Sequence, residues 1–359
     1  MLDPRADLNP VTELGPRRKV QLMDDPTRPE VGERLQVALR EGSIIVPGLT
    51  DSAAVEVRAL GAGESYAAWK VVDGSQAVVV RIPRRPPEEM PTSMQEELDA
   101  SALIDGSVGS RALAIDDSPE NALGAPFIVS NYVPGAVRTA AQWNDALLMA
   151  HARQMARLHD PRYEGAGAVG AEGAAIDLVS EFDDGYGWWQ ESHPDVTDSD
   201  SVVALGAEIR KRLLDARPFF DGMRYSFIHG DLVATNVVVD RGGVPRFIDW
   251  EWARIGDVAQ DLACIGGTVV GGPWYVPMKP STVKSFIAEY MATAAAQPHW
   301  NDESLERLQG RRHAWELYER FLSSLHFSKQ ARILDDPGFY PGAVRSLHAT
   351  LRSRLGLDG

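Results

Sequence analysis

The chain has 359 residues, 44% of them hydrophobic, which is the composition of a globular protein large enough for two separate cores. Its 51 acidic and 36 basic residues give a formal net charge of −15, which disfavours binding to nucleic acid or to an anionic membrane. That charge suits a small cationic ligand, or it serves solubility alone. The sequence shows no long apolar run and no signal-peptide pattern, so we expect a cytoplasmic protein, and its single cysteine, Cys264, is expected to be a buried structural thiol.

Residues 1–50 are rich in Pro, Asp and Arg and are predicted to form an N-terminal extension, with one helix over Pro29–Glu41 that packs on the first lobe. From Val55 the sequence changes to short runs of β-forming residues. The dipeptide Asp73-Gly74 lies between two runs of alternating apolar residues, which is the signal of a tight β-hairpin. A small antiparallel sheet is therefore expected in this part of the chain.

One helix and one strand are expected to complete the first lobe. The segment MQEELDASALI, from Met94, has helical spacing. Pro126–Val133 has the pattern of a buried strand, and it stops at the turn signal Pro134-Gly135. Residues 51–133 are accordingly predicted to be the first lobe.

Residues 134–359 are predicted to form a second, mainly helical lobe. The segment Ala140–His159 has apolar residues at helical intervals, and similar spacing continues through much of the C-terminal half. Residues 160–200 are rich in Gly, Asp and Ser and are expected to form a long irregular or partly helical insertion. The predicted fold class is α+β, with a small lobe built on an antiparallel sheet and a larger helical lobe.

The most informative stretch begins at Phe227 and reads FIHGDLVATNVVVDRGGVPRFIDWEWARIGDVAQDLA. It predicts a polar loop, a short strand, a glycine turn and a second strand that ends at Asp249. Asp231 and Asn236 stand five residues apart on the loop. The loop and the hairpin therefore present three polar groups at one edge, which is the arrangement that phosphoryl transfer requires.

Each of these three residues has a chemical role in this interpretation. Asp231 is expected to accept a hydrogen bond from the substrate hydroxyl and to take its proton late, because a loose transition state needs alignment more than a strong base. Asn236 and Asp249 are expected to supply oxygen ligands to Mg²⁺, which prefers them. The alternative is a capped turn before an ordinary strand end, but the spacing and the trailing GDVAQDLA favour a kinase.

The motifs HGDLVATN, IDWEWA and GDVAQDLA resemble the catalytic loop, the metal-binding loop and the following helix of the aminoglycoside phosphotransferase family. The resemblance extends, more weakly, from about Val55 to the C-terminal helices. It implies a bilobal protein-kinase-like fold, in which residues 51–133 are the nucleotide-binding lobe and residues 134–359 are the catalytic and acceptor-binding lobe. It also implies that Asp231 is the catalytic aspartate, that Asn236 and Asp249 bind magnesium, and that ATP or GTP is the phosphate donor.

Three neighbouring residues are expected to be structural. His229 is expected to anchor the loop through hydrogen bonds to the backbone rather than to catalyse. Asp257 and Asp261 match the tail of the family motif, where the resemblance implies that they cap a helix or tether the catalytic loop.

Two features of the first lobe suit a nucleotide. Gly61, Gly63 and Ser65 lie in GAGESYAAW between two strands, where glycines let backbone amides approach phosphates, although a plain tight turn has the same composition. Arg81 ends a hairpin strand where the family places a phosphate-binding Lys, so a forked guanidinium replaces an ammonium and the nucleotide affinity is in question. The segment VVRIPRR is similar to one in proteins that resemble macrolide phosphotransferases.

The surroundings of Arg81 leave two choices open. A surface basic cluster is the competing interpretation of this segment, with Arg84 and Arg85 more exposed than Arg81. A carboxylate on the helix from Met94 is expected to pair with Arg81, and Glu96 is preferred to Glu97 because it borders an apolar stripe. Either glutamate is alternatively a solvated helix charge.

The strand FIVSNYV resembles the family's hinge, where an extended backbone offers N–H and C=O groups to the edge of a purine. The candidates for this contact are Asn131, Tyr132 and Val133. Their side chains hardly matter to it, so the choice between ATP and GTP stays open. Any strand between two lobes would be equally apolar.

Acceptor contacts carry no portable motif, and two patches are candidates. Asp183, Asp184 and Trp188 belong to an acidic and aromatic segment that suits a protonated amino sugar, or that is a solvated loop with its tryptophans in the core. Trp274 and Tyr275 follow the metal-binding segment and form either a wall of the acceptor pocket or a helix-packing anchor.

The leading expectation is a Mg²⁺-dependent enzyme that phosphorylates a hydroxyl of a small cationic molecule, with aminoglycoside or macrolide antibiotics first. A kinase of a choline-, homoserine- or sugar-like metabolite, or a catalytically silent binding module, are the alternatives. A protein kinase is disfavoured, because IDW replaces the DFG-type motif and no APE-like segment follows it.

Overall fold

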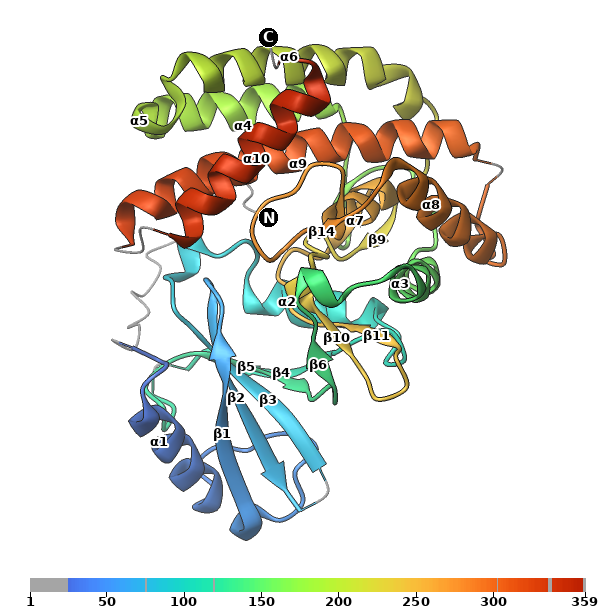
Figure 1. Cartoon of the computed structure of the whole chain (residues 1–359). Coiled ribbons are helices and arrows are strands. Elements are labelled where there is room, and N and C mark those ends of the chain that lie inside the picture. The colour runs from blue at the N-terminus through green and yellow to red at the C-terminus, as the bar shows by residue number, and fades with distance from the viewer. Residues whose placement is uncertain (1–24, 75, 119, 302, 335–337, 358–359) are drawn as a thin grey trace. The chain divides into compact units, whose positions relative to one another are not determined.

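The computed structural model describes residues 25–357, except residues 75, 119, 302 and 335–337 (Figure 1). The described chain forms two compact units, and the division falls between Val133 and Pro134. The part of the predicted extension that covers residues 1–24 lies outside the described residues. Within the described part, no helix is both long and apolar enough to cross a membrane.

The first unit is built on a five-stranded sheet in which neighbouring strands are antiparallel. In spatial order β1-β2-β3-β5-β4, the strands are β1 (Val55–Ala62), β2 (Tyr66–Asp73), β3 (Gln76–Pro83), β5 (Phe127–Asn131) and β4 (Ala112–Asp116). The predicted hairpin is present, because Asp73 of β2 pairs with Gln76 of β3. Gly74 supplies the left-handed φ of +59° that the turn needs.

Helix α1 (Pro29–Arg40) packs beside β1 in the first unit (Figure 1). Its buried residues Val31, Leu35 and Leu39 recur at helical spacing, and they share a core with alternate residues of β3, including Val80. The predicted helix is therefore confirmed, and it is part of the main core of this unit.

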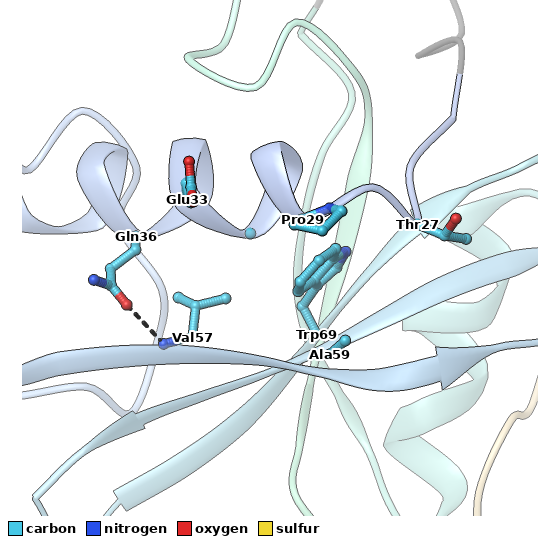
Figure 2. Close-up of a pocket in the computed structure, with 8 residues that line it drawn as sticks. Thr27, Pro29, Glu33, Gln36, Val57, Ala59 and Trp69 are labelled. Carbon is cyan, nitrogen blue, oxygen red and sulfur yellow. Dashed lines mark hydrogen bonds between the residues drawn. The ribbon is translucent and has the colours of Figure 1, made fainter.

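A groove of about 330 Å³ lies between α1 and the sheet (Figure 2). Gly32 lets the helix approach the Trp69 ring, because a Cβ there would lie 2.4 Å from a ring carbon. The amide of Val57 donates to Oε1 of Gln36 across the groove (3.0 Å). Trp69 faces the α1 core and Arg81 projects from the other face of the sheet, so this groove is separate from the predicted phosphate site.

The second face of the sheet carries a smaller apolar cluster that includes Tyr66 and Ile128. Helix α2 (Met94–Ala100) contacts β4 on this side. The helix begins with a capping box, in which Ser93 Oγ accepts from the amide of Glu96 (3.2 Å) and the Glu96 carboxylate accepts from the amide of Ser93 (2.7 Å).

The second unit is mainly helical. Its helices are α3 (Asp145–Leu158), α4 (Leu178–Ser192), α5 (Pro194–Thr197), α6 (Asp200–Ala216), α7 (Val258–Cys264), α8 (Pro280–Ala294), α9 (Leu305–Ile333) and α10 (Phe339–Leu355). Short strands form small sheets in the orders β11-β10-β6, β8-β7-β12-β9 and β13-β14. They are β6 (Ala136–Val137), β7 (Gly167–Ala168), β8 (Ala171–Glu172), β9 (Ser226–Ile228), β10 (Val237–Val239), β11 (Pro245–Phe247), β12 (Arg254–Gly256), β13 (Gly266–Gly267) and β14 (Val276–Pro277).

The first helices of this unit differ in detail from the sequence prediction. A 3-10 turn at Ala140–Gln142 precedes α3, and Asn144 caps α3 by accepting a hydrogen bond from the amide of Leu147 (2.9 Å). Residues 160–200, expected to be an irregular or partly helical insertion, are partly helical: the short strands β7 and β8 come first, and α4 and α5 follow. Asp177 caps α4 through the amide of Val179 (3.1 Å), which sets the start of that helix.

The long helix α9 holds the C-terminal end of α7 through buried arginines. Arg312 Nε donates to the carbonyl of Leu262 (3.1 Å), and Arg320 Nη2 donates to the carbonyl of Ala263 (2.7 Å). The last carbonyls of a helix lack partners within it and lie at the negative end of its dipole, so cations are stabilising there. Glu316 balances Arg312 through an ion pair (3.0 Å).

Candidate active site

The hairpin of β10 and β11 brings two of the three predicted catalytic residues to one end. Val237 pairs with Phe247 in antiparallel register. Asn236 immediately precedes β10 and Asp249 follows β11 by two residues, so both lie at the same end of the hairpin. The amide of Ile248 donates to the carbonyl of Asn236 (3.0 Å), which closes this end.

Asp231 and Asn236 are in direct contact. The Nδ2 group of Asn236 donates to Oδ2 of Asp231 (3.0 Å) and to the Asp231 carbonyl (2.8 Å). Both side chains are half-buried. Because the amide nitrogen is directed at Asp231, the amide oxygen points away from that carboxylate and is the atom that Asn236 can present to a metal ion.

Asp249 has an unusual backbone conformation. Among the described residues it is the only non-glycine residue with a positive φ, +67°. The left-handed conformation costs an L-residue about 1 kcal/mol and persists where the surrounding structure imposes it. Such strain concentrates at functional sites, so the conformation supports the importance of Asp249.

Asp261 tethers the catalytic loop, as the family resemblance implied. Its Oδ2 accepts hydrogen bonds from the amide of His229 (2.8 Å) and from His159 Nε2 (3.1 Å), and its Oδ1 accepts from the amide of Gly230 (2.9 Å). Burial alone would raise the pKa of this carboxyl, but the hydrogen bond and charge of His159 outweigh burial and lower the pKa. The carboxylate form is therefore the one that holds the loop.

The backbone next to Asp231 is tightly constrained. His229 Nε2 donates to the carbonyl of Ile248 (2.9 Å), so the predicted structural role of His229 is confirmed. Gly230 has a φ of +81°, and a Cβ there would lie 2.2 Å from the carbonyl oxygen of Trp252. Only glycine satisfies both constraints, which fixes the direction in which the chain enters Asp231.

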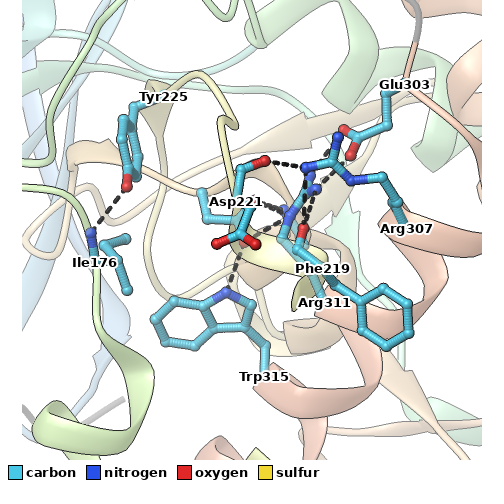
Figure 3. Close-up of polar contacts among 10 residues, drawn as sticks. Ile176, Phe219, Asp221, Tyr225, Glu303, Arg307, Arg311 and Trp315 are labelled. Carbon is cyan, nitrogen blue, oxygen red and sulfur yellow. Dashed lines mark hydrogen bonds and ion pairs between the residues drawn. The ribbon is translucent and has the colours of Figure 1, made fainter. Parts of the chain in front are cut away.

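Asp257 joins α7 to α9. It caps α7 by accepting from the amide of Ala259 (3.0 Å), and it also accepts from Arg311 Nε (3.1 Å) and Trp315 Nε1 (2.9 Å). Figure 3 shows Arg311 and Trp315 on α9 with Glu303, which also pairs with Arg311. The predicted capping role of Asp257 is confirmed, and the buried ion pair with Arg311 adds to it.

Arg81 pairs with Glu97, so the sequence preference for Glu96 is wrong. An Nη2 group of Arg81 donates to Oε1 of Glu97, and both residues are buried. Glu96 is turned back to the N-terminal end of the helix by its capping box with Ser93. The Arg81 guanidinium also lies 4.7 Å from the centre of the Tyr66 ring.

The other nucleotide candidates are surface loop and strand residues of the first unit. Gly61 is exposed near the end of β1, Gly63 is exposed in the loop between β1 and β2, and Ser65 of the same loop is buried. The amide of Asn131 donates to the carbonyl of Arg111 (3.1 Å), and that of Tyr132 to Ala77 (3.3 Å). Lys70 Nζ lies 3.7 Å from the centre of the Tyr132 ring. Contacts of Asn131, Tyr132 and Val133 with a purine stay a prediction.

The acidic and aromatic patch is a surface of α4. Asp183 forms a two-bond ion pair with Arg210 of α6, both bonds at 2.7 Å, and Asp184 is exposed beside it. Trp188 packs edge-on against Trp189, with ring centres 5.1 Å apart. These contacts account for the patch by packing between helices, and its role in acceptor binding stays a prediction.

Trp274 lies beside the catalytic loop. Its carbonyl accepts a hydrogen bond from the amide of Ala234 (2.9 Å), and its half-buried ring stacks on Phe327 with centres 4.3 Å apart. Tyr275 is buried, and its hydroxyl donates to Ser323 Oγ (2.9 Å). The guanidinium carbon of Arg320 lies 3.5 Å from the centre of the Tyr275 ring. Burial raises the pKa of Tyr275 to about 12. These contacts pack Tyr275 inside the second unit, and a role of Trp274 or Tyr275 in the acceptor pocket stays a prediction.

Nothing in the sequence indicated that Gln260 and Glu319 would meet beside the loop that carries Asp231. Gln260 Nε2 lies 3.2 Å from Oε1 of Glu319 and 3.5 Å from the carbonyl of Gly230, and its Oε1 accepts from Arg254 (2.8 Å). Burial raises the pKa of Glu319 to about 8, and the charge of Asp231 acts in the same direction. These residues are far apart in the chain, so no local spacing could have revealed the group.

The antiparallel sheet of the first unit, the helical second unit and the tethered loop that carries Asp231 and Asn236 define a kinase-like phosphotransferase fold. The chain matches the model of the phosphotransferase enzyme family over residues 56–325, more than half of its length, and it belongs to that family. The expected α+β, protein-kinase-like fold class and the family resemblance are both confirmed. No curated protein matches the chain.

Solved structures with the same fold include kinases and phosphotransferases of small molecules. A choline kinase from Cryptosporidium parvum is 16% identical, with a TM-score of 0.60, over 90% of this chain and 96% of that protein. The aminoglycoside phosphotransferase APH(4)-Ia is 14% identical, with a TM-score of 0.57, over 91% and 99%. The choline kinase LicA from Streptococcus pneumoniae is 16% identical, with a TM-score of 0.53, over 83% and 93%. At these identities the likeness shows the fold alone.

Proposed function

We propose that the protein transfers the γ-phosphate of ATP or GTP to a hydroxyl group of a small cationic molecule. The observation that carries the proposal is the contact between Asp231 and Asn236 (3.0 Å) on a loop that Asp261 holds from below. Asp249, at the same end of the hairpin as Asn236, completes the set. This is a proton acceptor next to two oxygen donors suited to a hard cation.

Asp231, Asn236 and Asp249 have different roles in the proposed reaction. Asp231 orients the acceptor hydroxyl towards the phosphate and receives its proton as the new P–O bond forms. Asn236 and Asp249 fit Mg²⁺ through an amide oxygen and a carboxylate, and the ion would neutralise charge on the phosphates. Asn236 also holds the Asp231 carboxylate through Nδ2, so it aligns the proton acceptor.

The phosphate donor is proposed to contact Arg81. The ion pair with Glu97 and the Tyr66 ring restrict its guanidinium to one buried position. A fixed guanidinium offers donors in a planar fork that matches phosphate oxygens. Solved relatives in the fold have been crystallised with nucleotides, including APH(4)-Ia variants with ADP or AMP-PNP and hygromycin B.

The acceptor is proposed to be cationic, with aminoglycoside or macrolide antibiotics as the first compounds to test. The net charge of −15 favours approach of a cation. The second candidate is a choline-like amino alcohol, and the Trp274 ring stacked on Phe327 beside the loop favours it, because aromatic faces attract ammonium groups. Intact Asp231, Asn236 and Asp249 argue against a silent binding module.

The test is nucleotide consumption with Mg²⁺ against aminoglycosides, macrolides and amino alcohols, with a mass increase of one phosphate on the acceptor. Asp231→Asn keeps a group that accepts the hydrogen bond from Asn236 but cannot take a proton. We expect kcat to fall by about 10² to 10⁴-fold while nucleotide binding is kept. Asp240→Asn, in the β10–β11 turn, is the matched control, and near-parental turnover by Asp231→Asn would contradict the assignment.

A further inference from the structure

The loop between β1 and β2 is bound to the two arginines that follow β3. We propose that Arg84 and Arg85 are positioning residues that hold this loop, residues 63–65, in the shape that receives the nucleotide phosphates. The inference rests on the proposed function, because it assigns these arginines to the phosphate donor of that reaction. All of the contacts lie within the first unit.

Both arginines reach the loop, and they do so through different atoms. The amide of Arg84 donates to the carbonyl of Ser65 (2.8 Å), and its Nη1 donates to the carbonyl of Gly63. Arg85 Nη2 forms an ion pair with Oε2 of Glu64 (2.6 Å). Three consecutive residues of the loop are therefore held by two consecutive residues of the segment after β3.

The strands fix the two ends of the loop but not its tip. Gly61 pairs with Ala68 and Ala62 with Ala67 in the β1–β2 ladder, whereas Gly63 and Glu64, beyond the last pair, are exposed. A Cβ at Gly63 would meet no atom within 4 Å. The amide of Gly63 donates to the carbonyl of Tyr66 (2.9 Å), which is a turn contact of the loop itself. Ordering a loop residue costs conformational entropy, so partners that order the loop in advance lower the cost of binding.

The arginines are placed to act on the same ligand as Arg81. Arg81, Arg84 and Arg85 all belong to the end of β3 or the segment directly after it. Arg84 is exposed and Arg85 is half-buried, whereas Arg81 is buried and paired with Glu97, in the order of exposure that the sequence predicted. The surface-cluster interpretation is thus incomplete, because both outer arginines have partners in the loop.

The ion pair between Arg85 and Glu64 allows a test in which simple electrostatics and the positioning role predict opposite changes in nucleotide affinity. Glu64→Gln removes a negative charge next to the proposed phosphate site, so electrostatic attraction alone predicts tighter nucleotide binding. The same change replaces the ion pair with Arg85 by at most a neutral hydrogen bond, so the positioning role predicts weaker binding. An exposed ion pair of this kind supports a two- to fivefold effect, roughly.

We therefore expect Glu64→Gln to raise the dissociation constant for the nucleotide by about two- to fivefold, measured by calorimetry on the full chain. Arg84→Ala should give a similar increase, and the KM for the acceptor should stay unchanged in both variants. Glu56→Gln is the matched control, because Glu56 pairs with Arg58 on β1 (2.6 Å) away from the loop. Thermal melting should be unchanged in all three variants.

The outcomes separate the two proposals. A parent protein that binds no nucleotide contradicts the proposed function and, with it, the role of the arginines. A parent protein that binds nucleotide, together with Glu64→Gln binding that is equal or tighter, overturns the positioning role and leaves the proposed function standing.

Discussion

Gly63 occupies a position where neither backbone conformation nor packing requires a glycine. Its φ lies outside the left-handed region, and a Cβ would meet no atom within 4 Å. Gly61, at the end of β1, differs because its φ of +147° favours glycine. Close approach of phosphate oxygens to the backbone is the reason that the proposed function supplies for glycine at position 63.

Gly63→Ala is expected to fold normally and to bind nucleotide more weakly. A methyl group would stand where phosphate oxygens approach the backbone, and the loss of one hydrogen bond to a charged group raises the KM for nucleotide by about tenfold. Gly106→Ala is the matched control, since Gly106 is in the same unit and is equally open. Steady-state kinetics and thermal melting of both variants test this, and an unchanged nucleotide KM for Gly63→Ala would contradict it.

The partner of Arg81 could be narrowed from the sequence to two adjacent glutamates but not to one of them. The sequence identifies Arg81 and a helix that carries two adjacent glutamates. The choice between them depends on the residue before the helix, because Ser93 captures Glu96 in a capping box and Glu97 is left to face the sheet. The apolar stripe that favoured Glu96 is short, so the local cap decided the outcome.

At the scale of elements, α7 connects α9 to the loop that carries Asp231, because residues of α7 and its cap bond to both. Its first turn is held by the bond from Asp257 to Arg311, and Asp261, one turn later, holds the amides of His229 and Gly230. The last turn is held by arginines of α9. A short helix of this kind gains its stability from these partners rather than from its own length.

Arg311→Leu is expected to lower the free energy of unfolding by about 3–5 kcal/mol, because it leaves the buried Asp257 carboxylate and the half-buried Glu303 carboxylate without their cation. Arg332 lies on the same helix as Arg311 and forms an exposed ion pair with Asp195 of α5. Arg332→Leu removes this pair and should lower the free energy of unfolding by about 0–1 kcal/mol. Urea unfolding of both variants measures the difference. Equal losses would show that the buried pair does not hold α7.

Local patterns revealed most elements, but the contacts between distant segments were not visible in the sequence. The hairpin of β2 and β3 and the loop from His229 to Asn236 follow from turn residues and short spacings. The arginines of α9 bind carbonyls about fifty residues earlier in the chain, and nothing in a helical pattern marks them. The acceptor residues could not be predicted for the same reason, because several helices would have to supply them.

At the scale of the whole molecule, buried titratable groups set the dependence of stability on pH. Burial lowers the pKa of His151 to about 3 and that of His313 to about 4, from 6.5 in the unfolded chain. Below pH 6.5 the unfolded chain therefore binds more protons than the folded protein, and stability falls as the pH is lowered. Glu319 acts in the opposite sense, because burial raises its pKa from 4.5 to about 8.

Between pH 4.5 and 8 the folded protein holds a proton on Glu319 that the unfolded chain has lost, so this group makes stability fall as the pH rises. Below pH 6.5 the two histidines outweigh it, and above pH 6.5 it acts without them. We therefore expect maximum stability near pH 6.5, with a decline towards pH 8 of at most about 1.4 kcal/mol per pH unit.

Glu319→Gln should remove that decline, whereas Glu306→Gln, an exposed change on the same helix, should retain it. Urea unfolding at pH 5.5, 6.5 and 8 tests the sign, and a parental decline that persists in Glu319→Gln would assign it to another group.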